Sequence, residues 1–553
     1  MQRRATARPT PAARLASATP SDGTADDGTV FPQGVASGDP TPAGTILWTR
    51  VDPDVYRDGT DIGVEVADDG RFDDPRAWTV PSEEIDPATD HTIKVDLDGD
   101  LAPGRYAYRF VYDGASSPIG RCRTLPAPDS SPDSLRLAVL TCQDYRNGYY
   151  GAYHHVAEAD LDFLLHLGDF IYEDGGSSRY DDRSISLPSG SDVAMGLDDY
   201  RHLYRTYRSD RFLQAALARH SLLATWDDHE IVNNRYWSYA EDRPYAGVGD
   251  HPRNTDAQFM TQLFADGIRA WWEYLPTRVR YDPDAETLLD QLRLWRTVSF
   301  GDLLDLVITD ERLYRSSPTG GAQAGARVES GTAVPGALDE TMLGADQRAW
   351  FLDELRESEA TWTGWANEVV AMDLQLDWDE LSLFNSDSWD GFERERERIM
   401  ATIRDAPVEN FVALTGDLHT ALAGYLHYTY DDDRSRPDAR LGVEFATPAI
   451  TSLNLLEALP GDDTDSLTRL IEQLTLERNP HLEAFDSHHW GYSVVEFTPD
   501  AATYSVYGVD KTDDSSEANK QLLARYRCPA GDYRLQRLDE DGDGGLSSLF
   551  DYC

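Results

Sequence analysis

Residues 163–173 of this chain are Phe-Leu-Leu-His-Leu-Gly-Asp-Phe-Ile-Tyr-Glu, and they decide the fold class. The first five, Phe163–Leu167, form a short apolar run that predicts a strand buried on both faces of a sheet. A second apolar run, Leu135–Leu140, precedes it, and a helical pattern at Tyr153–Ala159 lies between the two. Strand, helix and strand in this order predict a βαβ unit.

The alternation of strands and helices continues toward the C-terminus. Further strands are predicted at Leu222–Thr225, Leu303–Ile308, Trp365–Met372 and Phe411–Leu414, with an antiparallel addition at Gly491–Phe497 and Thr503–Val509. Helical patterns lie at Phe259–Leu275, Asp346–Arg356 and Phe392–Arg404. The sequence therefore predicts an α/β core over residues 133–510 with much of its sheet buried.

The segment before this core has a different pattern. Residues 31–125 contain short strand-like runs separated by Pro and Gly, which predict a small all-β sandwich. These runs are Ile46–Val51, Ile62–Ala67, Ile93–Leu97 and the alternating stretch Arg105–Asp113. Residues 1–30 are rich in Ala, Thr, Pro, Ser and Asp and predict a disordered lead-in, and residues 511–553 predict an acidic tail.

The chain is strongly acidic, with a net charge of −49 and three lysines against 47 arginines. This balance argues against nucleic acid as a partner, because phosphate backbones require a basic surface. An acidic surface with almost no lysine indicates adaptation to high salt, since the Debye length is only about 3 Å at 1 M salt. Capture of calcium or other cations by that surface is the alternative. No apolar run approaches the roughly 20 residues that span a bilayer, and we expect a monomer.

Both ends of the chain carry short motifs that resemble functional signals but that also have a simpler explanation. Arg3 and Arg4 resemble the start of a twin-arginine export signal, but no apolar segment follows them. Asp539, Asp541, Asp543 and Gly544 match positions of a calcium-binding EF-hand loop, but Phe550 replaces its bidentate Glu, so a solvated acidic turn is expected.

The chain has four cysteines, Cys122, Cys142, Cys528 and Cys553. They include no Cys-x-x-Cys pair, which excludes a zinc ribbon or a thioredoxin motif, while Cys528 and Cys553 could form a disulfide.

Polar residues with metal-binding side chains follow four of the predicted strands. They are Thr141-Cys142-Gln143, then Asp169 with Tyr172, then Asp227-Asp228-His229-Glu230 with Asn233-Asn234, and finally Asp417 with His419. Any one of these could be a helix cap or a turn. Open α/β sheets, however, place their sites at the carboxyl ends of strands, so all four are expected at one edge. Together they predict a metal site.

These residues lie in longer strings that resemble the alkaline phosphatase D (PhoD-like) family of the metallophosphoesterase superfamily. The strings are Phe31–Pro40, Ile46–Arg50, Thr141–Gln143, His166–Glu173, Trp226–Glu230, Asp310–Arg315, Asp387–Phe392 and Gly416–His419. The resemblance extends from about Phe31 to Val509. It implies a β-sandwich domain followed by a metallophosphoesterase core, in which helices flank a double β-sheet.

The resemblance also implies a metal centre of ferric iron, Fe(3+), with calcium, Ca(2+). Cys142 and Tyr172 stand at the thiolate and tyrosinate iron ligands, and Asp169 stands at the bridging carboxylate. The remaining ligands expected from the motifs are Asp228, Asn233, Asp417 and His419, with Asp227 and Asn234 as adjacent alternatives. Many members of the superfamily have Asn at the position of Asp228, and the Asp here favours calcium.

The implied activity is metal-dependent hydrolysis of small phosphate esters by in-line attack of a metal-bridging hydroxide or oxide. His229 would protonate the leaving oxygen, or else orient Asp228, and Arg312 would bind phosphate oxygens, or else form a surface ion pair. The rival functions are a phosphodiesterase of the phospholipase D type and a non-catalytic calcium-binding surface protein. A non-catalytic calcium-binding protein would have no need for Cys142, Tyr172 and His229 together. The family commonly leaves the cell by the twin-arginine route, which implies a secreted or cell-surface enzyme.

Overall fold

The computed structural model describes residues 10–11, 28–68, 70–317, 340–378, 381–383, 386–406, 408–430, 435–459 and 464–538. Several sequence-based expectations fall outside these ranges. They concern Arg3 and Arg4, most of the predicted lead-in, the EF-hand-like residues 539–550, and Cys553 as a partner of Cys528. Cys122, Cys142 and Cys528 are buried free thiols.

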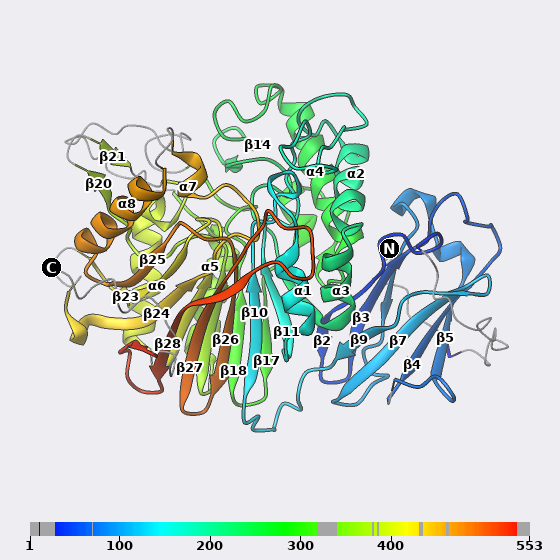
Figure 1. Cartoon of the computed structure of the whole chain (residues 1–553), viewed down its shortest axis with the longest axis horizontal. Coiled ribbons are helices and arrows are strands. Elements are labelled where there is room, and N and C mark those ends of the chain that lie inside the picture. Colours follow the sequence, from blue (N-terminus) through cyan, green and yellow to red (C-terminus); the bar gives the residue numbers. More distant parts are fainter. Residues whose placement is uncertain are drawn as a thin grey trace.

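Two large sheets form the core (Figure 1). The first has ten strands in the order β29-β28-β27-β26-β10-β11-β12-β2-β3-β6. Its central strands are β26 (Gly491–Thr498), β10 (Leu135–Leu140), β11 (Phe163–Leu167) and β12 (Ser221–Thr225). The second has seven strands in the order β17-β18-β19-β22-β24-β23-β25. These strands are β17 (Arg296–Phe300), β18 (Leu304–Ile308), β19 (Trp362–Asn367), β22 (Phe411–Thr415), β24 (Arg440–Ala446), β23 (Ala421–His427) and β25 (Leu482–Asp486).

The two sheets pack against each other through alternate residues of their strands. Phe445 of β24 stacks on Tyr504 of β27 (Ala501–Val509), with ring centroids 4.6 Å apart. On β22, Val412 and Leu414 belong to the hydrophobic cluster between the sheets. Phe411 on the same strand belongs to a second cluster, which includes residues of α5 (Gly344–Glu357) and α6 (Glu393–Asp405). The predicted double sheet flanked by helices is confirmed.

Helices also cover the outer face of the first sheet. These helices are α1 (Gly151–Glu158), α2 (Leu197–Arg208), α3 (Arg211–Arg219) and α4 (Ala257–Tyr274). The sequence predicts α1, α4, α5 and α6 to within two residues at either end, but not α2 and α3. Three of the six buried residues of α2 are tyrosines, Tyr200, Tyr204 and Tyr207, and most of its other residues are charged or polar, so few aliphatic side chains mark its buried face.

The N-terminal segment is all-β, as predicted, but it is not a separate sheet. Strands β2 (Val35–Thr41), β3 (Gly44–Arg50) and β6 (Thr92–Asp96) continue the ten-stranded sheet beyond β12, where Leu222 pairs with Gly38. A Cβ atom at Gly38 would lie 2.6 Å from the Leu222 carbonyl oxygen, so only glycine allows this approach.

A second, smaller sheet closes the N-terminal sandwich. Its strands include β4 (Ile62–Ala67), β5 (Arg76–Val80), β7 (Arg105–Tyr112), β8 (Ala115–Ser116) and β9 (Gly120–Arg123), at the right of Figure 1. A third hydrophobic cluster joins the two layers and contains Leu47 and Val95 from the main sheet with Val64 and Phe110 from the smaller one. One layer of the sandwich is thus an extension of the catalytic core.

Two expectations need correction near the C-terminal half. Residues 511–553 do not form an acidic tail throughout, because β28 (Lys520–Pro529) and β29 (Gln536–Arg537) extend the ten-stranded sheet. The predicted strand Trp365–Met372 is shorter, since β19 ends at Asn367. Beyond it, the backbone N–H groups of Ala371 and Met372 each donate to the buried Glu444 carboxylate at 2.8 Å instead of to a neighbouring strand.

Helix α8 (Thr464–Arg478) and strands β23, β24 and β25 also lie outside the sequence-based predictions. Among the helices in the described part of the chain, none combines the length and the apolar character needed to cross a bilayer.

Candidate metal centre

The polar residues that follow β10, β11, β12 and β22 meet where the two sheets face each other. Cys142 follows β10, Asp169 follows β11, Asp227 and Asp228 follow β12, and Asp417 follows β22. Backbone hydrogen bonds fix the first two ends together, since Cys142 N–H donates to the Gly168 carbonyl at 3.2 Å. The backbone at residue 168 can approach Asp227 this closely only because the residue is glycine. Its φ is +102°, and a Cβ atom would lie 2.3 Å from Asp227 N.

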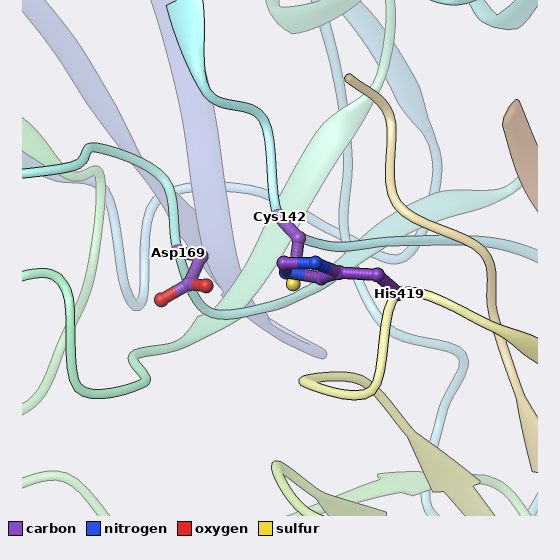
Figure 2. Close-up of side chains that lie close together, drawn as sticks. All are labelled: Cys142, Asp169 and His419. Atoms are coloured by element: carbon purple, nitrogen blue, oxygen red, sulfur yellow. The ribbon is translucent and has the colours of Figure 1, made fainter. Parts of the chain in front are cut away.

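Three overlapping groups of side chains could hold metal ions. Cys142, Asp169 and His419 form the first group, shown in Figure 2. Asp169, Asp228 and His229 form the second, and Asp227, Asp228 and Asp417 form the third. Within each group the ligand atoms lie within 4.8 Å of one another. Because Asp169 and Asp228 are each shared by two groups, the arrangement describes neighbouring ion positions in one row.

Tyr172 completes the first group. Its hydroxyl donates to Asp169 Oδ2 at 2.8 Å and lies 3.3 Å from His419 Nε2. The His419 ring is oriented by its other nitrogen, Nδ1, which contacts the Leu453 carbonyl. That contact leaves Nε2 directed toward Tyr172 and available to a metal ion. The structure therefore brings together Cys142 and Tyr172, which the resemblance assigns to iron, with the bridging candidate Asp169 and with His419.

The backbone at these ligands is held in the left-handed conformation. The φ angles are +55° at Cys142, +56° at Asp169, +61° at Asp417 and +57° at His419. Non-glycine residues rarely adopt this region, and each instance costs about 1–3 kcal/mol when the structure imposes it. Asp and His tolerate it better than Cys does. Four such residues at one site indicate that the fold, and not local preference, sets the direction of the ligands.

Burial and mutual repulsion favour the neutral forms of these side chains. Burial, with the charges of Asp169 and Asp227, raises the pKa of the Cys142 thiol well above its usual value. Burial likewise raises the pKa of Tyr172 and Asp169, and it lowers the pKa of His419 to about 4. Asp227 Oδ2 is buried without a hydrogen-bond partner among the described residues. Cations would satisfy all of these groups, and ligation would release protons.

The donor types fit the two expected ions. Thiolate, phenolate and imidazole at one end suit ferric iron, and carboxylates at the other end suit calcium. Two asparagines border the carboxylates: the Asn234 N–H donates to Asp228 Oδ2 at 2.7 Å, and the Asn233 N–H donates to Glu173 Oε1 at 2.7 Å. These contacts involve backbone atoms only, so the assignment of Asn233 as a ligand stays a prediction.

His229 lies beside the ligands and is held by a carboxylate. Its Nδ1 lies 2.6 Å from Glu173 Oε2, and its side chain is 18% exposed. Burial acts to lower the pKa of His229, but Glu173, followed by Asp169 and Asp228, raises it well above its usual value. The Glu173 carboxylate therefore favours the protonated form of the imidazole. Sequence reasoning assigned no role to Glu173, although it directly follows Tyr172.

Arg312 is fully buried, so the expectation of a surface ion pair is wrong. Its Nη1 donates to Asp387 Oδ2 at 2.6 Å and its Nη2 donates to Asp417 Oδ1 at 2.7 Å, while Nε bonds Asp227. Arg315 holds the other oxygen of Asp387 at 2.6 Å. Arg312 thus neutralises carboxylates of the third group, which sequence alone could not show, and Asp387 joins the site through it.

Comparisons with known proteins agree with this geometry. The family model for PhoD-like phosphatases matches residues 137–506, and the model for their N-terminal domain matches residues 16–126. This chain belongs to the PhoD-like phosphatase family. It is 32% identical over 480 residues to alkaline phosphatase D of Bacillus subtilis, covering 85% of this chain and 76% of that protein. A solved structure of PhoD superposes with a TM-score of 0.78 at 28% identity, covering 95% of each chain.

Membership of the PhoD-like phosphatases makes this chain a phosphoric ester hydrolase. It argues against the non-catalytic calcium-binding protein considered from the sequence. The family match over residues 137–506 includes every ligand candidate named above.

A further part of this PhoD-like site comes from the segment after β27. Lys511 is buried, and its Nζ donates to the Thr451 carbonyl at 2.8 Å and to Glu457 Oε2 at 2.7 Å. Thr451 and Ser452 in turn donate their N–H groups to the Cys142 carbonyl at 3.3 and 3.2 Å. The same loop supplies the Leu453 carbonyl that orients His419. Lys511 therefore anchors a loop that touches two ligands of the first group.

We expect Lys511→Met to weaken the first group without touching it. Loss of such an outer partner typically costs about 10–100-fold in metal affinity. The measurement is the iron content and visible spectrum of purified protein. Lys520→Met is the matched control, because Lys520 is exposed on β28 and loses the same charge. Equal iron content in both variants would contradict the anchoring role.

Proposed function

We propose that this PhoD-like phosphatase hydrolyses phosphate monoesters at a centre of ferric iron and calcium. The observation that carries the proposal is the row of three ligand groups, with Cys142 at one end and Asp417 at the other. Cys142, Tyr172 and His419 would hold iron, and Asp169 would be shared between iron and calcium. Asp228, Asn233 and Asp417, with Asp227 beside them, would hold calcium. When bound, these ions supply positive charge to phosphate oxygens and lower the pKa of water.

The protein's own residues would manage the proton and the charge of the ester. His229 carries a proton beside Asp169 and Asp228, and it would donate that proton to the leaving oxygen. Glu173 would keep the imidazole protonated and fix its orientation. Arg312 would stabilise charge at the phosphate once cations attract Asp227 and Asp417.

The test compares hydrolysis of a phosphate monoester with that of a diester by protein of known metal content. We expect p-nitrophenyl phosphate to be hydrolysed faster than bis-p-nitrophenyl phosphate, with activity lost on chelation and restored by iron with calcium. Faster hydrolysis of the diester would favour the phosphodiesterase alternative. Protein that holds both metals and hydrolyses neither ester would refute the proposal.

The iron assignment gives a second prediction. A phenolate bound to ferric iron absorbs in the visible, so concentrated protein should be coloured. Tyr172→Phe removes the phenolate and should abolish or shift the band. Tyr207→Phe is a matched control, since its hydroxyl contacts Tyr172 N–H at 3.1 Å but is not a ligand candidate. An unchanged band in Tyr172→Phe, or active protein without iron, would contradict the assignment.

The charge of −49 gives a third prediction, which concerns salt. Repulsion among unscreened carboxylates should lower the melting temperature in dilute buffer, and molar sodium chloride should raise it. Calcium should raise the melting temperature by more than its ionic strength alone would. Binding to the folded state alone adds about 2.7 kcal/mol to the free energy of unfolding at a hundredfold excess over Kd. Thermal unfolding in sodium and calcium at matched ionic strength checks both. A melting temperature independent of salt would show that the charge is no salt adaptation.

We also propose that the enzyme acts outside the cytoplasm. Its ligand candidates come from residues as far apart as Cys142 and His419, so the centre can form only in the folded chain. Export of the folded protein, as by a twin-arginine route, would preserve it. Fractionation of cells that produce the full chain tests this, and mature enzyme confined to the cytoplasm would refute it.

A further inference from the structure

Two buried cationic side chains lie where the N-terminal strands meet α2. Lys94 on β6 pairs in register with Trp48 on β3, so both side chains are on the same face of the sheet. Arg208, the last residue of α2, lies over Trp48 with Cζ 3.6 Å from the ring centroid. Lys94 Nζ lies 4.4 Å from the centroid of Trp272. None of these four residues belongs to the candidate metal-binding groups.

Most hydrogen-bond donors of this cluster have no partner. Arg208 is 0% exposed, and only Nη1 is bonded, to the Tyr274 carbonyl at 2.6 Å. Among the described residues, Arg208 Nε and Nη2 and Lys94 Nζ have no acceptor. The hydroxyl of Tyr204, one helical turn before Arg208, also lacks one. Buried donors and charges without a partner are costly, so an acceptor is expected among them.

The neighbouring carboxylates are already engaged by other arginines. Asp39 and Glu273 are the carboxylates that act on Lys94 electrostatically. Glu273 binds Arg201 at 2.7 Å and Arg269 at 2.8 Å. Asp39 binds Arg296 at 2.6 Å and also accepts a backbone N–H at 2.7 Å. In a chain of net charge −49, this junction therefore carries an excess of buried positive charge.

Burial also affects the two cations themselves. Burial, together with the charge of Arg208, lowers the pKa of Lys94 to about 7, and burial lowers the pKa of Arg208 to about 9. A bound anion would reverse both effects, since an opposite charge favours the protonated form.

We propose that Lys94 and Arg208, with the Tyr204 hydroxyl, bind a small inorganic anion, a halide such as chloride. The recognising groups can all donate hydrogen bonds, and the two cations lie beside the rings of Trp48 and Trp272, which suits a compact monovalent anion. The anion would link β6 to α2, and so join the N-terminal layer to the helices that cover the main sheet. This site is independent of the proposed phosphatase chemistry.

Thermal unfolding at constant sodium, with gluconate replaced by chloride, tests the site in the full chain. We expect the melting temperature of the wild type to rise with chloride, by an increment that grows with the logarithm of its concentration. Lys94→Met should lose most of that increment and Lys520→Met should keep it, although both remove one charge. An equal increment in the two variants would overturn the proposal.

Crystals grown in bromide give a direct measurement that needs no variant. We expect an anomalous peak within hydrogen-bond distance of Lys94 Nζ and Arg208. Water alone at this position would overturn the proposal, even if Lys94→Met fails to fold.

Discussion

Asp169→Asn should lower kcat/KM by about 10³-fold or more, because metal ions supply several kcal/mol of transition-state stabilisation. Asp169 belongs to two of the three ligand groups, and it also accepts the Tyr172 hydroxyl at 2.8 Å and the His229 N–H at 3.3 Å. The amide keeps the size of the side chain but removes its charge. Iron and calcium content should fall together, since both ion positions use this carboxylate.

Stability separates this effect from misfolding. Burial, with the nearby carboxylates, raises the pKa of Asp169 well above its usual value, so its charge opposes folding when no metal is bound. Metal-free Asp169→Asn should therefore melt no lower than metal-free wild type. Asp405→Asn, an exposed change at the end of α6, should retain both metals and activity. Full activity in Asp169→Asn would show that the two ion positions do not share the Asp169 carboxylate.

His229→Gln should have the second largest effect, and its size should depend on the leaving group. General acid catalysis contributes about 10²–10⁴-fold. We expect the full loss with an alkyl phosphate, whose alkoxide needs the proton, and a small loss with p-nitrophenyl phosphate. Equal losses with the two esters would instead support the alternative that His229 orients Asp228.

Glu173→Gln tests the role of the His229 proton through the pH dependence of activity. Glu173 is the strongest of the groups that raise the pKa of His229, so removing its charge lowers that pKa. An acid catalyst must be protonated, and activity falls as pH rises through its pKa. The alkaline limb of the kcat/KM profile should therefore move to lower pH in Glu173→Gln. An alkaline limb at the wild-type pH would show that His229 is not the acid.

The fold class and much of the candidate site could be predicted because both depend on short-range patterns. Apolar runs such as Phe163–Leu167 define buried strands, and parallel strands bring their carboxyl ends to one edge. That rule alone places Asp169 and Asp228 near each other. Asp417 follows β22 of the other sheet, so the expectation of a single sheet edge is wrong for it, and it reaches them because the two sheets pack together. The resemblance then adds roles for Cys142 and Tyr172, which chemistry alone would leave open.

The remaining features depend on contacts between distant residues. Arg312 is a plausible surface residue by sequence, and only tertiary packing shows four aspartates around it. Lys511 reaches the centre because the antiparallel strands after β25 return to β10. The strand β28 has a polar and charged sequence, and its pairing with β27 decides its structure.

The position of β10 between β11 and β26 also sets the order in which the enzyme can be made. One neighbour of the strand that carries Cys142 is synthesised soon after it, but the other begins only at Gly491, and the anchoring Lys511 comes later still. At about 5–20 residues per second, the ribosome needs roughly 20–70 s between Cys142 and Lys511. The surroundings of Cys142 are therefore complete only after that interval. Any metal that needs the whole ligand set would be bound in the compartment where folding finishes.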